Sequence, residues 1–297
     1  MRSGLTSSSF AEGVLIRRFD PWRSHYCTCP PKYSLSPYTG CGHSCVYCYI
    51  TSYVPSAFKP RAKHDVVKRV SNDVTVIDKR VPILLSASSD PYTPMERTLG
   101  ITREVLQILA RAGTRFMIQT KSDLVVRDAD VISSAGAVVG MTVTTLDTMA
   151  EKLEPNAPDP RSRLRALKKL SKIGISTVAR IDPIVPGISD GTMPKLVEAI
   201  ASSGVDHVIA STFKARPDSL NRISRAMPKA AVQLDRLYRK EGIRVSNCLY
   251  LDETIRRRTL TGLRDLVLEE GMTFATCREG FDDLRTSRSC DGTHLIK

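Results

Sequence analysis

Three cysteines lie close together in the segment "YTGCGHSCVYCY". Cys41, Cys45 and Cys48 have a C-x3-C-x2-C spacing, and tyrosines flank the last of them. A structural zinc ion takes four ligands, so three thiolates would need a partner such as His43 or a distant cysteine. A cubane iron–sulfur cluster on three cysteines instead leaves one iron open to an exchangeable ligand. Because His43 lies two residues from both flanking cysteines, where simultaneous chelation is awkward, the spacing favours the cluster.

The other five cysteines also matter, because the sequence contains eight in total and reduced thiols in a cytoplasmic chain point to metal or redox chemistry. Cys27, Cys29, Cys277 and Cys290 form a candidate second metal site for zinc or an auxiliary iron–sulfur cluster. A hydrogen-donor thiol, a redox pair and simple packing are the alternatives. Cys248 stands apart and is expected in the core.

The composition is that of a globular protein with a basic surface. The chain has 297 residues, 41% hydrophobic, and a net charge of +13. No apolar run reaches the roughly 18 residues of a membrane-spanning helix, and residues 1–14 lack the apolar core of a secretory signal, so we expect a cytoplasmic protein with no membrane partner. The charge makes nucleic acid the first partner to consider, although many basic proteins bind none.

Apolar, β-prone runs alternate with amphipathic helical segments along most of the chain. The predicted strands are 34–37, 81–88, 115–122, 137–145, 175–185 and 206–212, with a candidate seventh at 243–250. The clearest helix starts with Asp159 as its cap and Pro160 in its first turn, and it stops at Gly174. Alternation of this kind predicts an α/β fold, a partial (βα)6 TIM-like barrel. An open doubly wound sheet has the same periodicity, but no G-x-G-x-x-G fingerprint supports it.

The βα rhythm also suggests how the chain is divided. We expect an N-terminal extension over 1–32, the partial barrel over 33–251, and a C-terminal helix with a cysteine-containing tail over 252–297. In such a barrel, catalytic groups follow the carboxyl ends of the strands. The cysteine loop directly follows the first predicted strand, which places it at that end.

Several segments together resemble a known family. The cysteine spacing resembles the cluster motif of the radical S-adenosylmethionine (SAM) superfamily. The segments "SPYTGCGHSCVYCYITSY", "SASSDPYTPMERTLGITREVLQIL", "IQTKSDLVVRD", "VTTLD", "LEPNAPDPRSRLRAL" and "IDPIVPGISD" resemble its spore photoproduct lyase-like (SplB-type) members, over about residues 33–215. The resemblance implies a barrel of the radical SAM type and a [4Fe-4S] cluster on Cys41, Cys45 and Cys48. The cluster would reductively cleave SAM to methionine and a 5'-deoxyadenosyl radical that abstracts hydrogen from a substrate.

The resemblance also implies which residues contact the methionine part of SAM. Lys121 would lie near the SAM carboxylate, which its ammonium can neutralise. Thr142 would occupy a serine position that contacts the methionine moiety. Ser86, Ser88 and Asp90 are candidate acceptors for the amino group, although an Asp-Pro turn without a ligand explains the same residues.

Further residues would lie beside the adenosine and the cluster. Asp182 is the candidate for adenosine contact, and Tyr47 for covering the adenine. Tyr49 is the candidate catalytic residue, in a radical relay, with packing beside the cluster as the alternative role. One position departs from the family, because Ala87 stands where the lyase has its hydrogen-donating cysteine. This difference makes a true spore photoproduct lyase unexpected.

The expected substrate class is nucleic acid, either damaged DNA or an RNA base, with flavodoxin or ferredoxin as the reductant. Basic residues cluster in "PRSRLRALKKLSK", "FKAR" and "TIRRRTLTGLR", and such clusters either contact phosphates or form a solvated exterior. The alternatives are a radical SAM enzyme acting on a peptide or small metabolite, a cluster protein that transfers the SAM methyl group, and a non-catalytic zinc-stapled nucleic-acid-binding protein.

Overall fold

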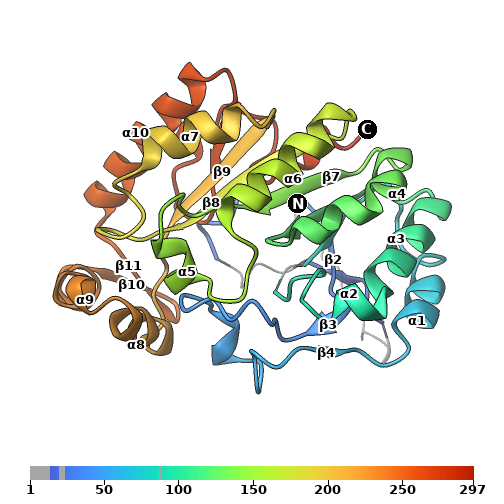
Figure 1. Ribbon diagram of the computed structural model, residues 1–297, viewed down its shortest axis with the longest axis horizontal. Helices are drawn as coiled ribbons and strands as arrows, with labels where there is room; N and C mark the ends of the chain where they lie inside the picture. The colour runs from blue at the N-terminus through green and yellow to red at the C-terminus, as the bar shows by residue number, and fades with distance from the viewer. Residues whose placement is uncertain (1–13, 20–23, 87) are drawn as a thin grey trace, which may run out of the picture.

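The computed structural model describes residues 14–19, 24–86 and 88–297, and its centre is one mainly parallel sheet (Figure 1). The described strands of this sheet follow the order β1-β2-β5-β6-β7-β8-β9-β12. Their bounds are Arg17–Arg18, Tyr33–Leu35, Ile83–Leu85, Phe116–Thr120, Val138–Thr142, Thr177–Ile184, His207–Thr212 and Thr273–Thr276. Each predicted strand from 34–37 to 206–212 overlaps one of them.

Neighbouring strands from β2 to β12 pair in parallel, whereas β1 pairs antiparallel with β2. In the described part of the chain, β1 and β12 stand at the two edges of the sheet. Consecutive parallel strands require crossover connections, and helices supply most of them. The α/β fold with a partial TIM-like barrel is therefore confirmed.

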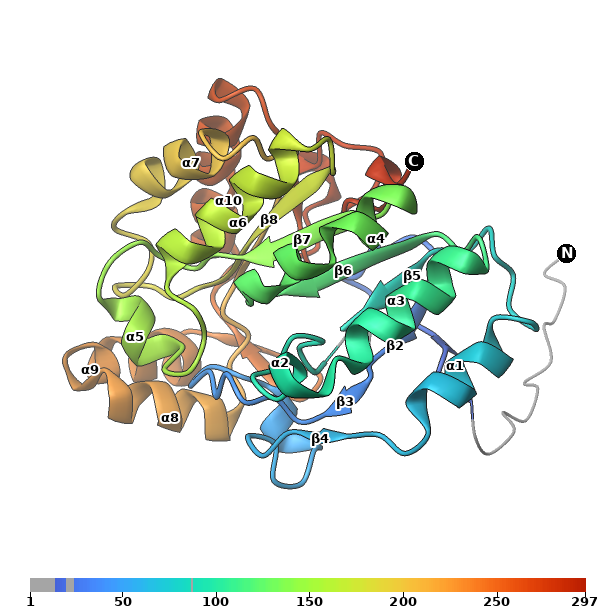
Figure 2. The same cartoon turned by 45° about the vertical axis from the view of Figure 1, so that its right-hand side comes forward.

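Helices cover the outer face of the sheet (Figures 1 and 2). The longer ones on this face are α1 (Val66–Asp73), α3 (Ile101–Arg111), α6 (Pro160–Lys172), α7 (Met193–Ala201) and α10 (Glu253–Glu269), with the shorter α2 (Glu96–Leu99), α4 (Ala129–Ser134) and α5 (Met149–Leu153). Each longer helix turns an apolar stripe to the strands; in α3 the side chains of Val105, Leu106 and Leu109 are fully buried. Burial of such stripes is the main favourable term that holds helices on a sheet.

The helix predicted from Asp159 is confirmed as α6. The Asp159 side chain caps it, since its carboxylate accepts a hydrogen bond from the Ser162 backbone N–H at 2.9 Å. Pro160 occupies the first turn, where its missing N–H costs nothing. Gly174 follows the helix with a φ of +78°, a conformation that favours glycine.

The candidate seventh strand at 243–250 is wrong. This segment forms a separate hairpin of β10 (Ile243–Val245) and β11 (Cys248–Tyr250), which pair antiparallel with each other. Ser246 adopts a φ of +53° in the tight turn between them, so a run that reads as one strand folds back on itself. The hairpin lies beside α8 (Pro217–Ala226) and α9 (Pro228–Asp235) (Figure 1). The last strand of the sheet is instead β12, which pairs with β9.

No helix in the described ranges is long and apolar enough to cross a membrane.

A buried carboxylate connects the segment after β12 to the rest of the barrel. Glu279 is 1% exposed, and one of its oxygens accepts hydrogen bonds from the Thr212 backbone N–H at 2.7 Å and from the Lys214 ammonium at 2.9 Å. Its other oxygen lies 3.0 Å from the guanidinium of Arg256, which is also 1% exposed. The C-terminal end of β9, helix α10 and the tail therefore share one buried ionic contact.

We expect Glu279→Gln to destabilise the fold. The amide would leave the buried Arg256 and the partly buried Lys214 without their anion, and an uncompensated buried charge costs about 3 kcal/mol or more. The free energy of unfolding, measured by urea titration with circular dichroism, should fall by about that amount. The control Glu270→Gln makes the same chemical change at an exposed position and should stay within about 0.5 kcal/mol. Equal effects of the two substitutions would contradict a structural role for the buried carboxylate.

Candidate active site

The carboxyl ends of the parallel strands surround a cavity of about 310 Å³. All eleven residues predicted for the cluster and the cofactor line it: Cys41, Cys45, Tyr47, Cys48, Tyr49, Ser86, Ser88, Asp90, Lys121, Thr142 and Asp182. They come from the loops and strand ends of five different strands. The structure therefore brings together residues that lie up to 141 positions apart in the sequence.

Short contacts shape the cysteine loop, which follows β3 (Tyr38–Thr39) and precedes β4 (Arg61–Ala62). The Cys41 backbone N–H donates to the Ala57 carbonyl at 2.8 Å. Gly40 has a φ of +79°, and a Cβ atom there would lie 2.8 Å from the same carbonyl oxygen. Only glycine fits such a close approach without rearrangement.

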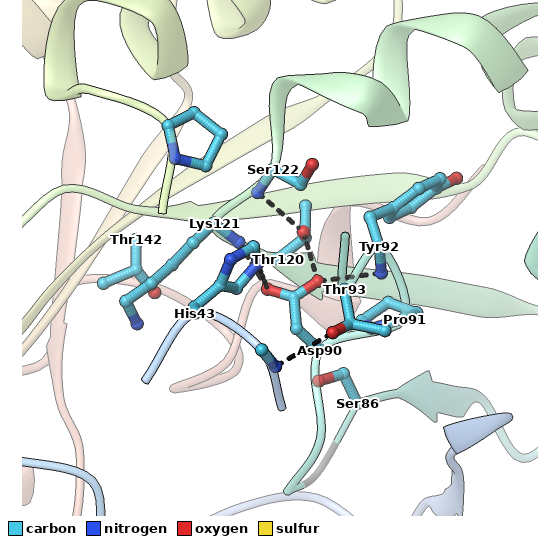
Figure 3. A network of polar contacts seen from close by, with 12 residues as sticks. His43, Ser86, Asp90, Pro91, Tyr92, Thr93, Thr120, Lys121, Ser122 and Thr142 are labelled. Carbon is cyan, nitrogen blue, oxygen red and sulfur yellow. Dashed lines mark hydrogen bonds and ion pairs between the residues drawn. The ribbon is translucent and has the colours of Figure 1, made fainter. Parts of the chain in front are cut away.

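Asp90 connects the cysteine loop to two strand ends (Figure 3). One carboxylate oxygen accepts hydrogen bonds from the Tyr92 backbone N–H at 2.9 Å and from the Thr120 hydroxyl at 2.7 Å. The other accepts from the Lys121 backbone N–H at 2.8 Å and lies 3.3 Å from the His43 ring Nε2. Both oxygens are thus already engaged by the protein.

The surroundings of Asp90 keep it ionised. Burial alone would raise its pKa, but the nearby His43 ring and the hydrogen bonds from Thr120 and from the Lys121 backbone outweigh burial and hold the pKa below its usual range. His43, considered above as a zinc ligand, is buried, and its Nδ1 lies 3.3 Å from the Asn156 carbonyl oxygen. Its contacts fit a role in fixing the loop.

Glu154 is a second buried carboxylate beside the loop, and the sequence interpretation missed it. It accepts a short hydrogen bond from the Tyr47 hydroxyl, and it lies 2.5 Å from the Arg163 guanidinium and 4.0 Å from the Lys121 ammonium. The Thr144 hydroxyl donates to it at 3.3 Å. Tyr47, expected over the adenine, thus has its hydroxyl turned to Glu154.

Opposite charges stabilise both ionised groups. Burial would raise the pKa of Glu154, but the Arg163 and Lys121 charges hold it below its usual range. Burial would likewise lower the pKa of Lys121, but Cys45 and Glu154 raise it above the ordinary value. Lys121 therefore presents a fixed positive charge beside the cysteine loop, 5.5 Å from the centre of the Tyr47 ring.

The remaining methionine-side candidates form hydrogen bonds at the cavity wall. The Ser86 hydroxyl donates to the Ser89 carbonyl at 2.6 Å, from a backbone with a φ of +78°. Thr142 is buried, and the Gln119 side chain donates to its hydroxyl at 3.3 Å. Ser88 also lines the cavity, whereas Ala87 lies outside the described residues.

Asp182 also lines the cavity, in the C-terminal half of β8. It accepts two hydrogen bonds from Arg180, at 2.9 and 2.6 Å, and one from the Ser211 hydroxyl at 2.7 Å. Burial would raise its pKa, but Arg180 and Lys214 hold the pKa below its usual range. Tyr49 is 37% exposed at the cavity, with its ring centre 6.2 Å from that of Tyr53.

Arg222 on α8 binds the backbone of the cysteine loop. Its guanidinium donates to the Val46 carbonyl at 3.0 Å and to the Cys48 carbonyl at 2.6 Å. Asp218, one turn earlier, lies 2.7 Å from Arg222 and orients it. Neither residue was singled out from the sequence, because the loop contacts of Arg222 join positions more than 170 residues apart.

The basic segments noted in the sequence have different roles. Arg163 of α6 and Arg256 of α10 are the two largest fully buried side chains, and each pairs with a buried glutamate. By contrast, Lys214 and Arg216 of "FKAR" line the cavity, and so does Arg278. The Nε atom of Arg278 is buried and has no hydrogen-bond partner within the described ranges.

The second group of cysteines also comes together. Cys29, Cys277 and Cys290 line the same cavity as the cysteine loop. The Cys29 and Cys290 sulfur atoms lie 3.6 Å apart, and Cys27 lies two residues before Cys29. Cys248, expected in the core, is buried and lines the cavity as well.

The donor set of the loop fits a three-cysteine cluster. Cys41, Cys45 and Cys48 are all free thiols on one short loop that faces one cavity. Among the residues that the structure describes, no three histidine, cysteine or acidic side chains are placed to share a single metal ion. Each thiolate of a cubane binds a different iron, so such thiols need not converge on one point.

Comparisons with known proteins agree with this arrangement. The chain is 32% identical over 163 residues to an uncharacterized protein of Methanocaldococcus jannaschii, a match that covers 54% of this chain and 62% of that protein, less than two thirds of its length. It is 24% identical over 232 residues to an uncharacterized protein of Mycobacterium bovis, covering 71% of this chain and 68% of that one.

Solved structures share the fold at low identity. Spore photoproduct lyase complexed with dinucleoside spore photoproduct has a TM-score of 0.65 at 15% identity, covering 88% of this chain and 76% of that one. SuiB of Streptococcus suis bound to its precursor peptide has a TM-score of 0.55 at 13% identity, covering 82% and 48%. The family model of the radical SAM superfamily matches residues 35–200. The chain therefore belongs to the radical SAM superfamily, whose enzymes use a [4Fe-4S] cluster and SAM.

Proposed function

We propose that this radical SAM enzyme holds its [4Fe-4S] cluster through Cys41, Cys45 and Cys48 and acts on a nucleic-acid substrate. When bound, the cluster and SAM supply reductive cleavage to methionine and a 5'-deoxyadenosyl radical that abstracts hydrogen. The observation that carries the assignment is the cavity itself, in which the cysteine loop and the strand ends bearing Lys121 and Asp182 face one another. The protein's task is to bind and orient the reactants and to exclude water.

The contacts of each side chain support particular roles. Lys121, with its charge fixed by Glu154, is the partner for the SAM carboxylate. Asp90, whose oxygens already accept hydrogen bonds from the protein, positions the loop and the Lys121 backbone. Ser86 and Ser88 stay candidates for the amino group, Thr142 for the methionine moiety and Asp182 for the adenosine.

Tyr47 and Tyr49 would have different roles beside the cluster. The hydroxyl of Tyr47 donates to a buried carboxylate, which supports a positioning role. Tyr49 is more exposed and lines the cavity, so it stays the candidate for contact with the reacting groups.

Positive charge on the cavity wall favours a phosphate-bearing substrate. Lys214, Arg216 and Arg278 all line the cavity, and the buried Nε of Arg278 has no hydrogen-bond partner among the described residues. The net charge of +13 acts in the same direction at long range. Of the structural neighbours, one was solved with a dinucleoside lesion and another with a peptide. The charges favour nucleic acid over peptide, and Ala87 favours a substrate other than the spore lesion.

Loss of a cluster cysteine should abolish the chemistry. After anaerobic reconstitution with iron and sulfide, the native protein with dithionite and SAM should release 5'-deoxyadenosine, measured by chromatography, and Cys45→Ala should release none above background. Cys248→Ala removes a thiol from the same cavity and should retain activity. If Cys45→Ala released as much 5'-deoxyadenosine as the native protein, Cys45 would not be a ligand of the cluster. Release of S-adenosylhomocysteine without 5'-deoxyadenosine would indicate methyl transfer instead.

Removal of the Lys121 charge should weaken SAM binding. A single charged contact contributes about 1.4 kcal/mol, so Lys121→Met should raise the Kd for SAM about tenfold. Anaerobic equilibrium dialysis with the reconstituted protein measures this directly. Lys152→Met, at an exposed position on α5, is the matched control and should leave the Kd unchanged. An unchanged Kd for Lys121→Met would remove this residue from the binding site.

Neutralising the cavity arginines should alter the salt dependence of nucleic-acid binding. Each lost phosphate contact makes the slope of log K against log salt shallower by about 0.7 for a single strand. We expect the double variant Arg216→Gln, Arg278→Gln to show a shallower slope with a fluorescent single-stranded oligonucleotide in anisotropy titrations. Arg161→Gln, exposed on α6, should show the native slope. Parallel slopes for all three proteins would exclude these arginines as phosphate contacts.

A further inference from the structure

Four cysteines outside the cluster loop come from segments that follow the two edge strands of the sheet. Cys27 and Cys29 lie between β1 and β2, whereas Cys277 directly follows β12 and Cys290 lies in the tail beyond it. Cys29 and Cys290 are 261 residues apart in sequence, yet their sulfur atoms lie 3.6 Å apart. The fold thus collects thiols from both ends of the chain at one place.

The remaining two thiols lie at the same place. Cys27 lies two residues before Cys29 on the same short segment. Cys277 lines the same cavity as Cys29 and Cys290. All four cysteines are free thiols, so no disulfide occupies them.

Contacts other than the thiols hold these two segments together. Lys32 and Asp291, both buried, form an ion pair between the segments. Gly280 has a φ of +81°, and a Cβ atom there would lie 2.9 Å from the Tyr26 ring. The thiols are therefore brought together by the fold itself.

The surrounding charges suit an anionic group. Arg180 donates a hydrogen bond to the Cys277 sulfur at 3.1 Å, and Lys32 lines the same cavity as Cys29 and Cys290. A carboxylate also binds each of these cations, since Asp182 pairs with Arg180 and Asp291 pairs with Lys32. Thiolate-bound metal centres carry negative charge, and such hydrogen bonds to sulfur and their outer partners are how proteins stabilise them.

We propose that Cys27, Cys29, Cys277 and Cys290 bind a second iron–sulfur cluster, a [4Fe-4S] cluster with four cysteine ligands. A cluster fits better than zinc because a C-x-C pair chelates one tetrahedral ion poorly, whereas adjacent thiolates can bind different irons. Each thiol loses its proton on binding, and the resulting anion is matched by Lys32 and Arg180.

The position of this site sets it apart from the loop site. Three of its cysteines line the same cavity as Cys41, Cys45 and Cys48. The two clusters would therefore both border this cavity. All irons of the second cluster would have a protein ligand, so SAM has no open iron to bind there. The second cluster would also join the two edges of the sheet through iron–sulfur bonds.

Iron and sulfide analysis of the full chain tests the proposal. Four proteins are reconstituted anaerobically with ferrous iron and sulfide: the native chain, a loop variant with Cys41, Cys45 and Cys48 all changed to alanine, the variant Cys29→Ala, Cys290→Ala, and the control Cys248→Ala. We expect about eight irons per chain in the native and control proteins and about four in each of the other two. Circular dichroism of each protein checks folding, and Cys27→Ser with Cys277→Ser provides a second pair if the first fails to fold.

Electron paramagnetic resonance after dithionite reduction separates the two sites. The signal of the loop variant should be unchanged by SAM, whereas that of the Cys29→Ala, Cys290→Ala variant should change. About four irons in the native protein, or none in the loop variant, would overturn the second cluster and leave the loop assignment intact. Zinc in place of iron in the loop variant, or a Cys29 to Cys290 disulfide found by mass spectrometry in the native holoprotein, would also overturn it.

Discussion

A carboxylate buried in a protein interior stays ionised only when cations and hydrogen-bond donors surround it, and the position of the cysteine loop depends on one such group. Glu154 is buried and is satisfied by Tyr47, Lys121 and Arg163. These partners come from the cysteine loop, from the end of β6 and from α6. Because all of them must reach one carboxylate, satisfying its charge fixes the loop against two elements of the barrel.

The same rule operates at two other strand ends. Asp90 connects the loop following β5 to Thr120 and Lys121 at the end of β6, and Glu279 connects the tail to the end of β9. These carboxylates at the carboxyl end of the barrel therefore accept hydrogen bonds from the protein itself. Several cations of the cavity wall pair with such carboxylates, as Lys214 does with Glu279, while Arg216 and Arg278 line the same cavity and carry the proposal of an anionic substrate.

Much of this arrangement could be predicted from the sequence, because it depends on short-range patterns. The cysteine spacing, the period of the strands and the cap at Asp159 are all local signals. Glu154 and Arg222 gave no such signal, since their partners become neighbours only when the barrel forms. The sequence of 243–250 predicts one strand because the turn at Ser246 has no glycine to indicate a hairpin. The basic segment that contains Arg163 is typical of an exposed helix face, although the Arg163 guanidinium is buried.

The cavity wall consists of residues inside the range that the family model matches and of residues outside it. The family model matches residues 35–200, which contain the cysteine loop and the strand ends that carry Lys121 and Asp182. Residues outside that range supply the rest of the wall, including Lys214, Arg278 and the cysteines of the tail. In the proposed function, reductive cleavage of SAM uses residues of the first part. The second part supplies charges that we propose for the substrate and thiols that we propose for a second cluster, so these proposed features lie outside the residues that the family model matches.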